Sequence, residues 1–189
     1  MTTQAPKTVL ASPNIRPADE ADMQAIQAIY AHHVLRGRAT FEELVPSVAD
    51  MQARRADIVN RGLPYLVAEC EGTVVGYAYA TAYRPRRAYR FTLEDSIYLA
   101  ADWPGRGIGY ALLSSLIAIC EAGPWRQMMA VVAYPRDGAG AASLALHEKL
   151  GFSRIGTLPA VGFKLGEWID TILMQRELGE GCRSLPSDI

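Results

Sequence analysis

A glycine-rich stretch at residues 105–109, Gly-Arg-Gly-Ile-Gly, is the first feature of this sequence that could do chemistry. It follows a β-prone segment over residues 89–99 and precedes apolar residues that recur at helical spacing from Ile108 to Ile119. The stretch therefore joins a strand to the N-terminus of a helix. Glycine lets the backbone approach a ligand, and the free N–H groups and dipole of a helix N-terminus favour an anion. We expect this loop to bind a phosphate or pyrophosphate.

Two common phosphate-binding motifs do not fit this loop. A P-loop ends in Gly-Lys followed by Ser or Thr, which the sequence lacks. A dinucleotide fingerprint that begins at Gly105 needs a third glycine where Tyr110 stands, and one that begins at Gly107 needs it where Leu112 stands. A plain reversal of the chain is the alternative interpretation of the glycines.

Glu94 is a charged residue in the middle of the β-prone segment, where Thr92 and Ser96 share its side and Leu93 lies on the other. A carboxylate within reach of an amine can act as a general base and accept its proton. The alternatives are an exposed strand face or a salt bridge with an arginine such as Arg90. We take Glu94 as the candidate base.

The segment over residues 84–90 carries four arginines and leads into this strand. Guanidinium groups suit bidentate recognition of a carboxylate or phosphinate. We assign Arg84 and Arg90 to anchoring of an anionic substrate, with Phe41 and Tyr83 as apolar walls. A solvated loop is the alternative, while the small size of the patch argues against nucleic acid.

Length and composition suit one folded domain with a substantial core, since the chain has 189 residues of which 50% are hydrophobic. Its 19 basic and 20 acidic residues give a net charge of −1, so no overall field attracts nucleic acid or a membrane surface. No apolar run is long enough to span a bilayer, and residues 1–12 lack the apolar core of a secretion signal. We expect a cytoplasmic protein that binds neither nucleic acid nor membrane.

The three cysteines, Cys70, Cys120 and Cys182, are scattered and odd in number. Their spacing fits neither a disulfide framework nor a metal site, which favours a reducing compartment and a protein without metal. His32 and His33 are expected on the first helix as surface or lid residues.

The elements that must position these residues follow from periodicity and turn signals. Asp19 and Ser47 are expected to cap the first two helices, and Gly76 to mark a β-bulge. The wholly apolar run 128–133 predicts a strand buried on both faces. The expected strands are 15–18, 64–71, 73–83, 89–99, 128–133, 152–161 and 166–177, and the expected helices 19–37, 47–62, 108–122 and 141–150. This order predicts a mixed α/β domain over 14–178, with a flexible N-terminal arm at 1–13 and a polar tail at 179–189.

Two motifs within this order resemble the GNAT superfamily of N-acetyltransferases. They are residues 105–113, Gly-Arg-Gly-Ile-Gly-Tyr-Ala-Leu-Leu, and residues 147–152, His-Glu-Lys-Leu-Gly-Phe. The resemblance covers about residues 14–178. It implies a central mixed, mostly antiparallel seven-stranded sheet flanked by helices, and acetyl-CoA as co-substrate with its pyrophosphate on the glycine loop.

A narrower resemblance is to the phosphinothricin N-acetyltransferase group. It is carried by Thr-Phe-Glu at 40–42, Tyr-Arg-x-Thr-x-Glu-x-Ser at 89–96, the segment 146–152, and Val-Gly-Phe-Lys-x-Gly-x-Trp at 161–168. That group acetylates the α-amine of glutamate-like amino acids such as phosphinothricin and methionine sulfoximine. The resemblance implies the same activity here, a cytoplasmic location and a homodimer.

The resemblance also implies roles for particular residues. Glu94 would be the base, acting directly or through a water, and His147 an acid or proton shuttle, although a histidine that only packs on the sheet is the alternative. Thr92 joins the substrate-binding residues. Backbone N–H groups at Ile97, Tyr98 and Leu99 would stabilise the oxyanion and pair with the pantetheine. The further coenzyme contacts are Gly105, Arg106, Gly107, Ile108, Gly109, Tyr110, Ser143 and Lys149.

The sequence departs from the superfamily at two positions. Pro104 stands where the loop usually begins with Gln or Arg, and proline has no N–H for a phosphate. Gly140 stands where an asparagine commonly precedes the last helix. Two alternative functions remain: a GNAT enzyme for another amine, such as a peptide N-terminus or an aminoglycoside, and a non-catalytic acyl-CoA-binding module.

Overall fold

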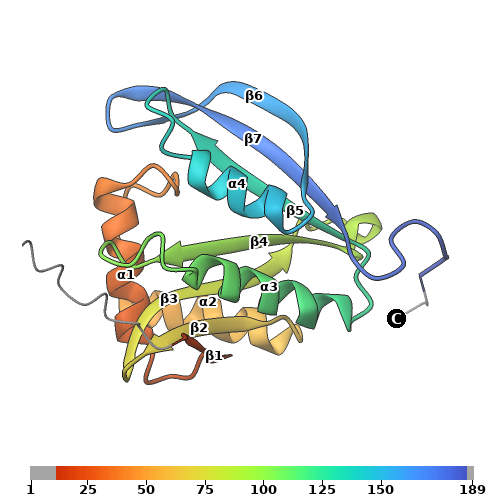
Figure 1. Ribbon diagram of the computed structural model, residues 1–189, viewed down its shortest axis with the longest axis horizontal. Coiled ribbons are helices and arrows are strands. Elements are labelled where there is room, and N and C mark those ends of the chain that lie inside the picture. Colours follow the sequence, from red (N-terminus) through yellow and green to blue (C-terminus); the bar gives the residue numbers. More distant parts are fainter. Residues whose placement is uncertain (1–11, 187–189) are drawn as a thin grey trace, which may run out of the picture.

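The β-prone segments pair into one sheet (Figure 1), which among the described residues, 12–186, has seven strands in the order β1-β2-β3-β4-β5-β7-β6. In this computed structural model the β4–β5 pair is parallel and the other pairs are antiparallel. The expected mixed, mostly antiparallel sheet is therefore confirmed. The strands are β1 (Asn14–Pro17), β2 (Tyr65–Cys70), β3 (Thr73–Ala82), β4 (Thr92–Leu99), β5 (Gln127–Tyr134), β6 (Ser153–Lys164) and β7 (Glu167–Glu177).

Helices cover both faces of the sheet. The helices are α1 (Met23–Arg36), α2 (Val48–Asn60), α3 (Ile108–Glu121) and α4 (Ala141–Lys149). On one face α1 and α2 pack on β2, β3 and β4, while α3 packs on the other face of the same strands. The shorter α4 packs on β5 and β6, beside α3 in the view of Figure 1.

The two faces are filled by different side chains. Under α3 the core is aliphatic, with Leu112 and Leu116 fully buried. Under α1 and α2 it is a set of tyrosines in which the rings of Tyr65 and Tyr79 stack at 5.0 Å and those of Tyr77 and Tyr98 at 5.3 Å. Because these aromatic rings interlock, they hold β2, β3 and β4 in a fixed register beneath α1.

The helix N-termini confirm one expected cap and correct the other. Ser47 caps α2 through a capping box with Asp50, as predicted. Asp19 does not cap α1, because the cap position is Asp22. The Asp19 side chain accepts from the Ala21 and Asp22 N–H groups in the turn before the helix, and the Asp22 carboxylate binds Arg16.

Two other expectations are wrong in detail. Tyr89 is not in β4 but in a 3₁₀ turn, Arg87–Tyr89, closed by bonds from the Tyr89 N–H to the Arg86 carbonyl and from the Arg90 N–H to the Arg87 carbonyl. β5 is not buried on both faces, since Val131 is 41% exposed. The pairing of β5 with β4 ends at Met129, and the face of β5 that carries Val131 is open to solvent after that point.

Gly76 lies at the expected irregularity of β3, because the β2–β3 register shifts between the pairs Ala68–Gly76 and Glu69–Val74. A Cβ at Gly76 would lie 2.6 Å from the Leu99 side chain and 3.1 Å from the Tyr98 carbonyl oxygen, so a larger residue there would force the Leu99 side chain to shift. The expected N-terminal arm lies almost wholly outside the described residues.

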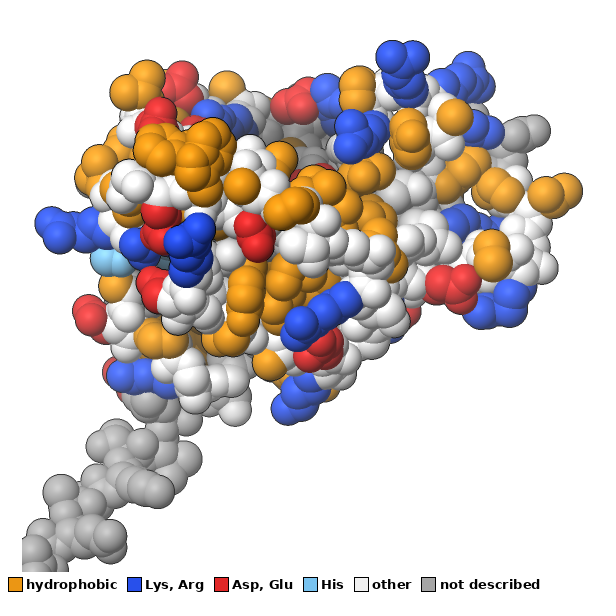
Figure 2. Space-filling view, turned by 90° about the horizontal axis from the view of Figure 1, so that it is seen from above, with side chains coloured by type: hydrophobic (Ala, Val, Ile, Leu, Met, Phe, Trp, Pro, Cys, Tyr) orange, Lys and Arg blue, Asp and Glu red, His pale blue; other side chains and the backbone are white. Residues whose placement is uncertain are grey.

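The edge strand β6 is unusual because its side chains are exposed over nearly its whole length. The exposed apolar residues are Ile155, Leu158, Val161 and Phe163, together with Trp168 at the start of β7. Figure 2, which views the molecule from above relative to Figure 1, shows hydrophobic side chains on this face among basic and acidic ones. An apolar edge strand of this length is a surface that other proteins cover by association.

Candidate active site

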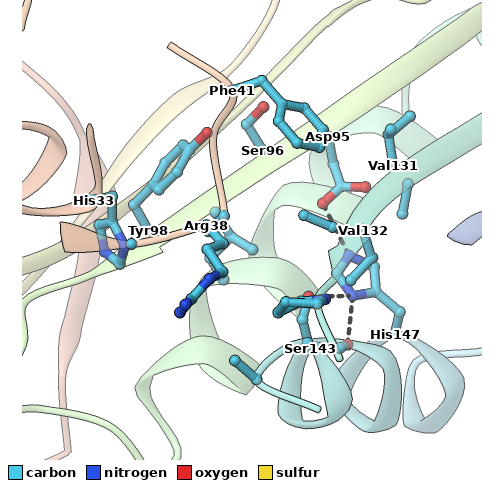
Figure 3. A pocket seen from close by; sticks show the side chains of 18 of the residues that line it. His33, Arg38, Phe41, Asp95, Ser96, Tyr98, Val131, Val132, Ser143 and His147 are labelled. Atoms are coloured by element: carbon cyan, nitrogen blue, oxygen red, sulfur yellow. Dashed lines mark hydrogen bonds and ion pairs between the residues drawn. The ribbon is translucent and has the colours of Figure 1, made fainter. Parts of the chain in front are cut away.

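A cleft opens where β4 and β5 part. Their pairing ends at Glu94 and Met129, although β4 continues to Leu99 and β5 to Tyr134. The diverging strands, the residues after α1 and the start of α4 enclose a cavity of about 400 Å³ (Figure 3). Its lining includes His33, Arg38, Phe41, Glu94, Asp95, Ser96, Ile97, Tyr98, Val131, Gly140, Ser143 and His147. The separation of two parallel strands thus makes a hollow in the middle of the sheet.

Glu94, the candidate base, lies on the cleft wall at the last paired position of β4. Its side chain is half-buried and faces the same side of the sheet as Thr81, its partner on β3. Burial raises the pKa of the Glu94 carboxyl, the neighbouring Asp95 raises it further, and Arg84 partly opposes the shift. A half-buried carboxylate with a raised pKa is a better proton acceptor than an exposed one.

His147 projects from α4 into the opposite wall and is 2% exposed. Its Nδ1 lies 2.7 Å from the Ser143 carbonyl oxygen and its Nε2 lies 3.1 Å from Asp95 Oδ2. Figure 3 shows these contacts as dashed lines that join α4 to β4. Burial alone would lower the pKa of His147, but the hydrogen bond and charge of Asp95 outweigh it, so the pKa lies above 6.5. The imidazole is therefore held in place at both nitrogens.

The third wall comes from the end of α1 and residues 37–41. His33 Nε2 donates to the Leu99 carbonyl at 2.8 Å, since a carbonyl oxygen can only accept, and this bond ties α1 to the end of β4. Burial lowers the pKa of His33, so its ring is neutral near pH 7. His32 is exposed, as expected, whereas His33 is partly buried and lines the cleft.

Lys164 at the end of β6 fixes the same wall from beneath. Lys164 is 2% exposed, and its ammonium donates to the carbonyls of Thr40 at 2.7 Å and His33 at 3.2 Å. Burial lowers the pKa of Lys164. Arg38 adds ion pairs to Glu167 and Asp137, so residues 37–41 are held between the β6–β7 hairpin and the loop before α4.

The glycine loop has the geometry expected of an anion site at a helix N-terminus. Gly105 and Gly107 have φ of 74° and 78°, which other residues adopt only with strain. The first helical bond of α3 runs from the Ala111 N–H to the Gly107 carbonyl, so the preceding amides have no partner within the helix. The first turn of α3 has no acidic residue. The loop does not line the cleft, but a Cβ at Gly109 would lie 3.7 Å from the Leu99 side chain at the end of β4.

The other residues predicted for the site are distributed unevenly around it. Phe41, Ile97, Tyr98 and Ser143 line the cleft. The Lys149 ammonium lies 4.8 Å from the centre of the Tyr110 ring, at the junction of α4 and α3. Tyr83, Arg84, Arg90 and Thr92 are not among the cleft-lining residues.

The basic segment lies at the far side of Glu94. The Arg84 guanidinium lies 5.0 Å from the centre of the Tyr83 ring, and its charge reaches Glu94. The Arg90 guanidinium lies over Phe91 and donates to the Arg87 carbonyl at 3.3 Å.

Gly140, one of the two departures from the superfamily, has a steric reason. A Cβ at this position would lie 2.4 Å from the Ala133 carbonyl oxygen, so any side chain would push α4 away from β5. The glycine therefore lets α4, and with it His147, approach the cleft closely.

Sequence reasoning missed several residues that build the cleft. Asp95 carried a usable signal, because it shares the buried face of β4 with Leu93, where an unpaired carboxylate would be costly. Lys164 lies in the motif at 161–168, but nothing in the sequence points to its partners, and Arg38 carried no signal, since the partners of both are far away in sequence.

Within residues 12–186, no group of three or more His, Cys, Asp or Glu side chains could hold a metal ion. In the same part of the chain, no helix is both long and apolar enough to cross a membrane.

Comparisons with known proteins point to one family. Residues 15–173 match the family described as the acetyltransferase (GNAT) domain. The chain is 56% identical over 172 residues, 91% of its length, to 86% of a phosphinothricin N-acetyltransferase from Alcaligenes faecalis. It is 38% identical over 176 residues, 93% of its length, to 99% of an L-methionine sulfoximine/L-methionine sulfone acetyltransferase from Pseudomonas aeruginosa. A crystal structure of a phosphinothricin acetyltransferase from Sinorhizobium meliloti in complex with AcCoA superposes with a TM-score of 0.89 at 49% identity, covering 94% of this chain and 95% of that one.

Proposed function

Because this chain belongs to the GNAT acetyltransferase family, we propose that it transfers the acetyl group of acetyl-CoA to the α-amine of a small glutamate-like amino acid, such as phosphinothricin or methionine sulfoximine. The observation that carries the proposal is Glu94, a half-buried carboxylate at the point where β4 and β5 part. The similarity to enzymes named for these substrates supports the choice of acceptor.

The reaction forms an amide C–N bond, breaks a thioester C–S bond and moves one proton from nitrogen to sulfur. We assign to Glu94 the removal of the proton from the amine, directly or through a water, because its raised pKa suits that task. His147 is the second residue assigned to catalysis, as the proton-bearing group on the opposite wall. This is direct transfer between two bound substrates, so the walls must hold the amine and the thioester together.

We assign the coenzyme to the side of the cleft that leads to α3. The free amides of the loop 105–110 and the positive end of α3 would hold its pyrophosphate, and β4 backbone at residues 97–99 would pair with its pantetheine. Ser143 on the cleft wall and Lys149 at the end of α4 complete the proposed set.

We assign the acceptor to the side of the cleft that faces residues 37–41. Phe41 lines that side, and Arg84 lies close enough to Glu94 for its charge to act on it. Arg84 and Arg90 would bind the carboxylate and the second acidic group of the amino acid, with Tyr83 and Thr92 beside them. An anionic acceptor fits this basic segment better than a polyamine or aminoglycoside.

We also propose a homodimer that covers the exposed apolar side chains of β6, and a cytoplasmic location. The support for the dimer is the pair Phe163 and Trp168. Their ring centres lie 5.1 Å apart, and each side chain is more than half exposed. Light scattering coupled to size exclusion should give twice the chain mass. The variant Phe163→Asp should shift the protein towards the monomer, and a wild-type monomer at micromolar concentration would contradict the proposal.

The proposed activity is tested by release of free thiol from acetyl-CoA in the presence of an acceptor panel. Phosphinothricin, methionine sulfoximine and methionine sulfone should give turnover, whereas an aminoglycoside and a peptide N-terminus should give little. Turnover only with the peptide would show that the acceptor is a peptide N-terminus, while acetyl transfer itself would stand. Tight binding of acetyl-CoA by calorimetry, with no thiol release from any amine, would instead indicate a non-catalytic binding module.

A further inference from the structure

Asp95 is a buried carboxylate in the cleft wall for which the proposed reaction has no task. It follows Glu94 on β4 but points to the opposite face, and its side chain is 2% exposed. Its Oδ2 lies 3.1 Å from His147 Nε2, and its Oδ1 is buried without a hydrogen-bond partner among the described residues. In Figure 3 the carboxylate lies between β4 and the imidazole of His147. Burying a carboxylate with only one hydrogen-bonded partner costs folding free energy, so we expect this contact to have a function.

The hydrogen-bond partners of His147 fix where its protons lie. The Ser143 carbonyl oxygen, 2.7 Å from Nδ1, can only accept, so Nδ1 carries a hydrogen. An ionised Asp95 carboxylate can also only accept, so Nε2 carries a second hydrogen. If the proton moved to Oδ2, the pair would still hold the same number of protons. The pair of Asp95 and His147 therefore holds one more proton than a carboxylate beside a neutral histidine would hold.

Few other titratable groups face this pair. The Cys120 thiol approaches Asp95 from α3, and Glu94 is its neighbour on β4. From α4 the contacts of His147 are with Ser143, and the Phe152 ring meets the imidazole edge to face at 5.0 Å. Val131 and Val132 line the β5 side. Asp95 is thus the carboxylate that governs the charge of His147.

We propose that Asp95 is a positioning residue for the transfer: its carboxylate holds the His147 imidazole in one orientation with a proton on each nitrogen, so that Glu94 alone accepts the proton of the amine. This inference rests on the proposed acetyl transfer. The two faces of β4 then have different tasks. Glu94 on one face accepts a proton, and Asp95 on the other face keeps His147 protonated.

The inference is tested first on the wild-type protein, by NMR titration of the histidine ring protons. The chain has 3 histidines, so the His147 signal is identified by its absence from the variant His147→Gln. We expect His147 to titrate above 6.5, the ordinary value, because Asp95 outweighs burial. A wild-type His147 that titrates below 6.5 would overturn the proposal, whatever the variants do.

The variant Asp95→Asn then separates positioning from a structural role. Asparagine keeps the size of the side chain but not its charge, so burial should lower the pKa of His147 and the alkaline limb of the kcat profile should move to lower pH. At pH 8 we expect kcat to fall roughly tenfold or more, and to recover as the pH is lowered towards 6. A merely structural role would lower the melting temperature and leave both the titration and the profile where they are.

The matched control is Cys120→Ala, which removes the thiol that faces Asp95 and should leave the His147 titration and the pH profile unchanged. A folded Asp95→Asn with the wild-type profile would refute the positioning role even if the enzyme is an acetyltransferase. Absence of turnover in the wild type would refute the proposed function, while the NMR titration would still decide whether Asp95 holds the proton on His147.

Discussion

The two faces of β4 hold adjacent carboxylates in different surroundings. Glu94 faces the open side, half-buried, with the charge of Arg84 acting on it from the loop before β4. Asp95 faces the closed side, where α4 gives it His147 as a partner. Because a strand alternates its side chains, one residue step separates the carboxylate that we propose accepts a proton from the carboxylate that we propose holds one in place. The chemistry of a site is thus set by which face a carboxylate occupies as much as by its distance from the reacting atoms.

The largest effect is expected on the open face. Glu94→Gln removes the proposed base without changing its size, so kcat should fall by roughly two to four decades. The melting temperature should stay within a few degrees of the wild type, since Glu94 has no buried ion-pair partner to lose. Thiol release and a thermal scan on the same preparation test this, and an unchanged kcat would remove Glu94 from the mechanism.

On the closed face the effect is expected in stability. Asp95→Asn should lower the free energy of unfolding by about 1–3 kcal/mol, because a buried charge-assisted hydrogen bond is lost. Since the pKa of His147 is raised in the folded protein, the stabilisation is fully present below pH 6.5 and disappears as the pH rises through that raised value. Urea unfolding of both proteins from pH 6 to pH 9 should show the difference shrinking. A difference that grows with pH would contradict the assignment.

A smaller effect is expected when the open face loses its neighbouring cation. Arg84→Ala should raise the KM of the amino acid about tenfold, because a charge-assisted contact to its anionic groups is lost. It should also move the acid limb of the activity profile to higher pH, since Arg84 lowers the pKa of Glu94. Arg86→Ala, in the same exposed turn, is the control, and equal effects of the two variants would argue against a specific role for Arg84.

The smallest expected effect is in the wild-type profile itself. Burial and Asp95 raise the pKa of Glu94 above 4.5. The acid limb of the kcat/KM profile should therefore lie at a higher pH than the pKa of an ordinary glutamate. Activity is lost as the pH falls through the raised value, because the protonated carboxyl cannot accept a proton. The pH dependence of kcat/KM measures this, and an acid limb at or below 4.5 would show that the site does not perturb Glu94.

Local signals in the sequence predicted the parts of the fold that depend on neighbouring residues. The Ser47 capping box, the glycine loop before α3 and the β3 irregularity at Gly76 each involve residues close together in the chain. Tyr89 was misplaced because strand propensity ignores the bonds of the arginine-rich turn that precedes β4.

The rest of the candidate site depends on contacts between distant residues. His147 and Asp95 are 52 positions apart, and Lys164 is 124 positions from Thr40. Charge type alone could suggest that Asp95 has a partner but could not choose His147. The exposure of Val131 likewise follows from the divergence of two strands, which no window of the sequence contains.

The two hydrogen bonds of the Lys164 ammonium bear on the order in which parts of the protein form during synthesis. It joins the carbonyls of residues 33 and 40 only after the chain has been synthesised as far as the end of β6. The strands β1 to β4 and the helices α1 to α3 all precede β6 in the chain, so residues 37–41 are made long before the side chain that holds them. Loss of Lys164 would therefore leave the end of α1 and residues 37–41 without the cation that joins their carbonyls.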